Sequence, residues 1–84
     1  MPRLKKREPS AAEFVRAEIN GLLTQVQTIN NWTKEELASK LGLSAPTLLR
    51  RRKSIYTWQV SELKALAIIS RKSFSEILDI FNLI

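Results

Sequence analysis

The chain has 84 residues, 44% of them hydrophobic, and its 14 Lys and Arg outnumber 8 Asp and Glu to give a net charge of +6. A chain of this length forms one small domain with a modest hydrophobic core. The sequence contains no cysteine and no histidine, which excludes disulfides and the usual zinc ligand sets, and no cofactor is expected. No apolar run approaches about 18 residues, so no membrane span is predicted. A cytoplasmic location is expected.

Residues 1–10 contain two prolines and four cations and lack apolar periodicity. We interpret them as a flexible basic arm. The arm carries a net charge of +3, residues 50–53 carry +4, and the remainder carries −1. Positive charge in two clusters on a nearly neutral body is typical of proteins that bind polyanions. The alternative is that these clusters only keep the protein in solution.

Helical signals follow the arm along the whole chain. Three capping boxes, Ser10–Glu13, Thr33–Glu36 and Ser73–Glu76, predict helix starts, because each pair satisfies free backbone amides at the start of a helix. Helices are predicted at roughly 11–29, 34–41, 45–53 and 58–70, with a last helix from 74 and a loop at 54–57. Strand signals are weak, so the sequence predicts an all-α fold of about five short helices in one domain, 11–84.

Apolar residues at helical spacing indicate which faces are buried. The predicted inward residues are Val15, Ile19, Leu22, Val26 and Ile29 in the first helix, Val60, Leu63, Leu66, Ala67 and Ile69 in the fourth, and Phe74, Ile77, Leu78 and Phe81 in the last. The aromatic residues Trp32, Tyr56 and Trp58 are expected to anchor the core or loops locally. The alternative is that they stack on nucleic-acid bases.

The stretch from 34 to 53 predicts two short helices joined by a tight turn. Ala38 is small enough for a close approach of the two helices, and Gly42 accepts the positive φ that the turn requires. Ser44 is a favourable N-cap for the second helix, and Pro46 is tolerated in its first turn. Leucines 37, 41, 43 and 48 can then point into one core. This arrangement is that of a helix-turn-helix, whose second helix lies in the DNA major groove.

Residues 33–44 (TKEELASKLGLS), continuing through Thr47 and Leu48, resemble the lambda-repressor-like or Cro-type helix-turn-helix regulators. The helical pattern extends this resemblance over most of 13–80. It implies a lambda-repressor-like DNA-binding domain and a double-stranded DNA operator as partner. The DNA-binding residues that it implies are Lys34, Ser44, Ala45, Pro46, Thr47, Leu49, Arg50, Arg52 and Lys53, with Arg3, Lys5, Lys6 and Arg7 of the arm.

The resemblance also implies individual roles. Arg50 pairs with guanine O6 and N7, while Leu49 and Ala45 contact thymine methyl groups. Lys34 and residues 52–53 meet phosphates, and the arm adds affinity with little specificity. The chain departs from the family at Arg51, which occupies a position that is usually apolar. There, either the arginine stem runs along the core edge or the helix ends early. Ala45 and Pro46 cannot donate side-chain hydrogen bonds, so specificity rests on few contacts or on DNA shape.

The last helix has more apolar residues than one face can bury. Ile80, Leu83 and Ile84 remain after the predicted inward residues are assigned. They predict a homodimer that forms through this helix. A two-fold dimer would suit a DNA-binding protein, because its two copies can read two half-sites of an operator. Contact with another protein, or truncation from a longer chain, would also explain them.

We therefore expect a sequence-specific, double-stranded DNA-binding transcriptional regulator from a phage or bacterium, acting by occupancy of an operator. Control would come from its concentration or from a regulatory protein partner. The carboxylates are expected at helix starts or on exposed faces, where capping explains them. Without histidine, cysteine or a glycine-rich phosphate loop, an enzyme is not expected. The alternative function is a protein-interaction module, antitoxin-like or an adaptor, that uses its apolar C-terminal helix.

Overall fold

The computed structural model describes residues 10–81, and within them the chain forms five α-helices, one short 3-10 helix and no strand. The all-α prediction is therefore confirmed. Residues 1–9, which hold most of the predicted arm, and residues 82–84 lie outside this range. The elements are α1 (Ala11–Asn30), α2 (Lys34–Lys40), α3 (Ala45–Lys53), η1 (Ile55–Thr57), α4 (Val60–Ser70) and α5 (Phe74–Phe81).

The helix starts follow from local capping. In the boxes before α1, α2 and α5, the backbone N–H of the capping residue donates to the glutamate Oε1, over 2.7, 2.8 and 2.8 Å respectively. The predicted loop at 54–57 is instead largely the 3-10 turn η1, because the Thr57 N–H and Oγ1 both donate to the Ser54 carbonyl, over 3.0 and 2.6 Å.

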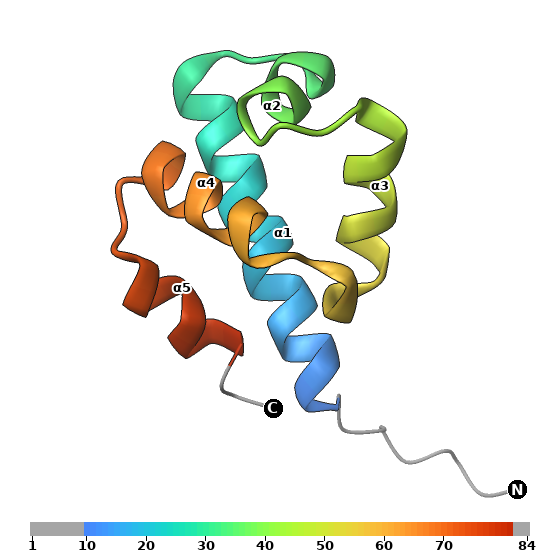
Figure 1. The fold of residues 1–84 in the computed structure, drawn as a ribbon, viewed down its shortest axis with the longest axis vertical. Coiled ribbons are helices and arrows are strands. Elements are labelled where there is room, and N and C mark those ends of the chain that lie inside the picture. The colour runs from blue at the N-terminus through green and yellow to red at the C-terminus, as the bar shows by residue number, and fades with distance from the viewer. Residues whose placement is uncertain (1–9, 82–84) are drawn as a thin grey trace, which may run out of the picture.

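α1 runs through the middle of the molecule, with α3 on one side, α5 on the other and α4 crossing it (Figure 1). α2 lies at the end where α1 finishes and packs against α3. Side chains from α1 and from the elements around it pack together into one hydrophobic core. Its largest fully buried members are Val15, Ile19, Leu23, Leu37, Leu66 and Ile77.

Three predicted inward residues are exposed. Ile29, in the last turn of α1, is 74% exposed, and Val60, the first residue of α4, is 59% exposed. In α5, Ile77 is fully buried and Leu78 is 37% exposed, since successive residues of a helix point about 100° apart. Ile80, three residues beyond Ile77, packs partly against the core instead. The prediction that Ile80 remains outside the core is therefore wrong.

Candidate nucleic-acid interface

α2 and α3 meet at the tight turn predicted at Gly42, whose φ is 77°. The Gly42 N–H donates to the Ser39 carbonyl over 3.0 Å, and the Leu43 N–H donates to the Ala38 carbonyl over 2.8 Å. Ala38 is 1% exposed, as expected for a small residue between closely packed helices. The turn thus fixes where α3 begins relative to α2.

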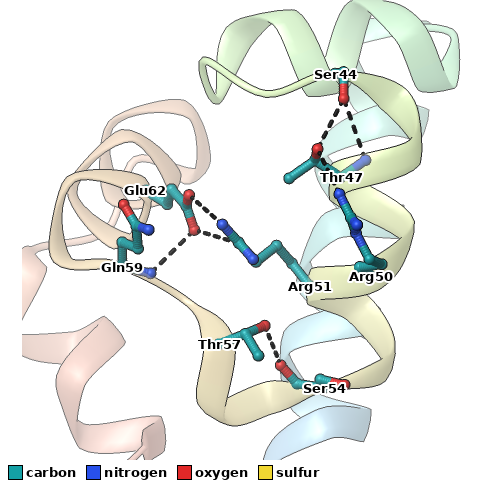
Figure 2. Close-up of polar contacts among 8 residues, drawn as sticks. All are labelled: Ser44, Thr47, Arg50, Arg51, Ser54, Thr57, Gln59 and Glu62. Atoms are coloured by element: carbon teal, nitrogen blue, oxygen red, sulfur yellow. Dashed lines mark hydrogen bonds and ion pairs between the residues drawn. The ribbon is translucent and has the colours of Figure 1, made fainter.

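The first turn of α3 is held by hydroxyl groups (Figure 2). Ser44 Oγ accepts from the Thr47 N–H over 3.3 Å and donates to Thr47 Oγ1 over 2.9 Å. Arg50 Nη2 donates to the same Thr47 Oγ1 over 3.4 Å. The guanidinium of Arg50 therefore lies along the helix, toward its N-terminal end.

Four residues of α3 are exposed together, and we call them the outer face of α3: Pro46, Leu49, Arg50 and Lys53. Their spacing of three and four residues places them on one side of the helix. Leu48, on the opposite side, is 3% exposed and belongs to the core. Ala45 and Thr47 are half-buried at the edges of the outer face. Residues 50–53 therefore do not present four parallel cations.

Arg51 points away from the outer face, toward α4 (Figure 2). Its Nε and Nη2 donate to Oε1 and Oε2 of Glu62 over 2.9 and 3.2 Å, and the Gln59 N–H donates to the same Oε1 over 3.0 Å. Glu62 lies in the first turn of α4 and caps that helix, as expected, but it is also 5% exposed and pairs with Arg51, which the sequence did not predict. α3 continues to Lys53, so the arginine is accommodated by a paired carboxylate rather than by an early helix end.

Arg52 points toward α1. Its Nε donates to Asn20 Oδ1 over 3.2 Å and its Nη2 to Thr24 Oγ1 over 3.4 Å, while Asn20 Nδ2 donates back to the Arg52 carbonyl over 3.4 Å. Asn20, Thr24 and Glu62 were not identified as functional residues from the sequence. The available signal was Arg51 itself, because an arginine at a core position requires a carboxylate partner.

The remaining predicted residues lie around this centre. Lys34 is exposed as the first residue of α2. Arg3, Lys5, Lys6 and Arg7 lie outside the described residues, as do Leu83 and Ile84.

The aromatic residues divide into two kinds. Trp58 is 9% exposed and belongs to the core, and Trp32 packs partly against it with Lys40 Nζ 5.5 Å from its ring centroid. Tyr56, in η1, is 67% exposed, so its predicted role as a local anchor is wrong. The exposed ring lies just beyond the end of α3.

Residues 10–81 lack two features that are typical of other functional classes. No group of three or more acidic residues there is placed to hold a metal ion. None of the helices described is both long and apolar enough to cross a membrane. Comparison with known proteins supplied no relative: no protein-family model, no curated protein and no solved structure matches the chain.

Proposed function

We propose that the protein is a sequence-specific, double-stranded DNA-binding transcriptional regulator of a phage or bacterium that acts in the cytoplasm by occupying an operator. The observation that carries this proposal is the outer face of α3, which presents Leu49, Arg50 and Lys53 to solvent while the other two arginines are held against α4 and α1. A short helix with one free cationic side fits the major groove.

Each residue of α3 then has a proposed role. Arg50 reads guanine through O6 and N7, and Leu49 contacts a thymine methyl group. Lys53 meets a phosphate, as does Lys34 at the start of α2. Arg52 would have to leave Asn20 and Thr24 before it reached a phosphate, so we assign it to the support of α3 rather than to direct contact.

The proposal includes a homodimer that uses the C-terminal helix. Leu78 is 37% exposed on α5, and the chain continues through Leu83 and Ile84 beyond the described residues. A two-fold dimer would place two copies of α3 about one helical turn of DNA apart. Leu78→Asp changes an exposed position without opening the core, and it is expected to convert a dimer into a monomer in sedimentation equilibrium. A wild-type protein that is already monomeric at every concentration would exclude the dimer.

The test of function is selection from a pool of random duplexes at about physiological salt, followed by sequencing. An enriched inverted repeat would support a dimeric, sequence-specific regulator and supply its operator. Binding without enrichment would indicate a nonspecific, architectural DNA-binding protein and contradict the proposal.

A second candidate function is a protein-interaction module of the antitoxin or adaptor type. Its support is exposed apolar surface away from α3, where Ile29 and Ile68 are 74% and 76% exposed. Absence of binding to any duplex at low salt, together with stable capture of a protein partner, would favour this candidate.

A further inference from the structure

We propose that a second DNA backbone subsite lies beside the outer face of α3, in a hollow of about 250 Å³ between the start of α1 and the end of α3. This inference rests on the proposed function and extends it. The hollow, here called the α1–η1 notch, has polar lining residues that could meet a phosphate, namely Arg16, Lys53, Ser54 and Tyr56, and its other lining residues are Glu13 and the apolar Ala12 and Ile55. The ligand that it fits is a phosphodiester of the bound duplex.

The notch contains two uncommitted cations. Among the described residues, neither Arg16 nor Lys53 makes a hydrogen bond or an ion pair, and both are exposed. Arg51 and Arg52, in contrast, are engaged with Glu62 and Asn20. Two positive charges around one hollow repel each other, and an anion between them replaces this repulsion by attraction. The notch is therefore electrostatically suited to a phosphate.

The position of Arg16 follows from the way α1 packs beside α3. Arg16, Asn20 and Thr24 are four residues apart and so lie on one stripe of α1. The last two hold Arg52, which brings the next turn of α1, with Arg16, to the end of α3. Lys53 belongs both to the outer face of α3 and to the notch. The two surfaces are therefore continuous, and one duplex can contact both.

The other groups at the notch are compatible with a phosphate. Ser54 and Tyr56 supply hydroxyl donors, and Tyr56 is 67% exposed. Glu13 also lines the notch, but its Oε1 accepts from the Ser10 N–H over 2.7 Å as part of the cap of α1. Glu13 thus has a structural use that fixes its carboxylate at the helix start. The larger hollow between α1 and α5 differs in its balance of charge, because the three carboxylates of Glu18, Glu76 and Asp79 line it beside one cation, Lys72, whereas the notch has two cations beside the carboxylate of Glu13.

The experiment compares Arg16→Gln with a matched control, Arg71→Gln, which removes the same charge at the far end of α4. Arg71 lines a hollow that no residue of α3 reaches. Duplex affinity is measured for both variants and for wild type over a range of salt concentrations, with thermal unfolding to verify the fold. Arg16→Gln is expected to weaken binding on the order of fivefold and to reduce the slope of log K against log salt by about 0.9. Arg71→Gln is expected to change neither.

A second measurement locates the contact on the DNA. Neutral methylphosphonates replace single phosphates along the duplex, one at a time. Replacement of the phosphate that Arg16 contacts is expected to weaken duplex binding by wild type. The same replacement should not weaken binding by Arg16→Gln further, because the variant has already lost that contact. Equal salt slopes for Arg16→Gln and wild type, on a duplex that both bind, would overturn the subsite and leave the proposed function standing. Failure of wild type to bind any duplex would overturn both.

A third measurement uses inorganic phosphate as the ligand. Its titration, followed by NMR signals of the Arg16 Nε–H and the Ser54 N–H, reports a free anion in the notch. Perturbation of these signals, combined with unchanged DNA affinity of Arg16→Gln, would assign the notch to a free anion and overturn the backbone subsite.

Discussion

The two glycines of the chain lie in different backbone conformations. Gly21 is in the middle of α1, and Gly42 is in the turn after α2 with a φ of +77°. Neither has a heavy atom within 4 Å of the position that a Cβ would take. Space therefore permits a side chain at both positions, and only the backbone distinguishes them.

Alanine at these two positions is expected to change stability in opposite directions. Gly21→Ala should raise the free energy of unfolding by about 0.5–1 kcal/mol, because alanine loses less backbone entropy in a helix. Gly42→Ala should lower it by about 1 kcal/mol, because a side chain is strained at positive φ. Urea denaturation of both variants measures the difference. A loss of stability for Gly21→Ala would mean that something in solution occupies the open side of α1.

The Arg51–Glu62 pair predicts an asymmetry between its two partners. The side chain of Arg51 is 18% exposed and that of Glu62 is 7% exposed, so the arginine retains more contact with water. Arg51→Met leaves a buried carboxylate and should cost about 2 kcal/mol, whereas Glu62→Gln should cost about 1 kcal/mol. The double variant should be more stable than Arg51→Met alone, because no buried charge remains. Chemical denaturation at neutral pH measures all three, and a double variant less stable than Arg51→Met would refute this reasoning.

At the scale of the element, α3 divides its functions among its sides. Its outer face is proposed to read DNA, and its other sides bind it to α4 and α1. Arg50→Ala is expected to cost about 1–3 kcal/mol of operator binding and to relax one base position. The matched change, Lys53→Ala, should weaken specific and random duplexes alike, because a phosphate contact carries no sequence information. Affinities for an operator and its single-base variants measure both, and equal losses on operator and random DNA for Arg50→Ala would contradict its role.

The capping box at the start of α5 is expected to stabilise the helix by an amount that varies with pH. The hydrogen bond from the Ser73 backbone, aided by the Ser73 hydroxyl and the charge of Lys72, lowers the pKa of Glu76 below its ordinary value of 4.5. A lowered pKa in the folded protein means that the ionised carboxylate stabilises α5 above about pH 4.5 and that this contribution is lost as the pH falls through the lowered pKa.

Glu76→Gln should therefore be less stable than wild type at neutral pH, and the difference should narrow in acid. Denaturation across this pH range measures it. Ser75→Ala, an exposed change on α5 outside the cap, serves as the control whose difference from wild type should not narrow. A constant difference for Glu76→Gln would show that the cap does not depend on the charge.

The helix starts were predictable because their signals are local. Each capping box lies within four residues, and α1, α2 and α5 each begin directly after the first residue of a predicted box. The buried faces were less predictable. The apolar pattern in α5 is compatible with either Leu78 or Ile80 facing inward. Ile80 faces the core because of the way α5 packs against α1 and α4, which the sequence of the helix alone does not specify.

The candidate site shows the same limit more strongly. The turn at Gly42 and the cap at Ser44 followed from single residue types. The directions of Arg51 and Arg52 did not, because their partners are 11 and 32 residues away along the chain. A run of four cations in sequence therefore gave no indication that Arg50 and Lys53 would be the two exposed ones.

At the scale of the whole molecule, positive charge is concentrated in two parts of the chain. Residues 50–53 are part of the folded domain, and Arg3, Lys5, Lys6 and Arg7 precede α1 in the chain. Deletion of residues 1–9 is expected to weaken binding to all duplexes alike and to reduce the salt slope by up to about 3–4, at about 0.9 for each phosphate contact. Salt titrations on specific and random duplexes measure this effect. A selective loss on the operator would instead assign base reading to the arm.

The central place of α1 has a consequence for the synthesis of the chain. α1 leaves the ribosome before the other helices described, yet its apolar side is covered by α3, α4 and α5, which are made afterwards. Until α4 has emerged, residues such as Ile19 and Leu23 have no complete core to enter, so a chaperone has its longest access to this helix. The domain is therefore expected to fold as one unit once α4 and α5 have emerged, rather than helix by helix.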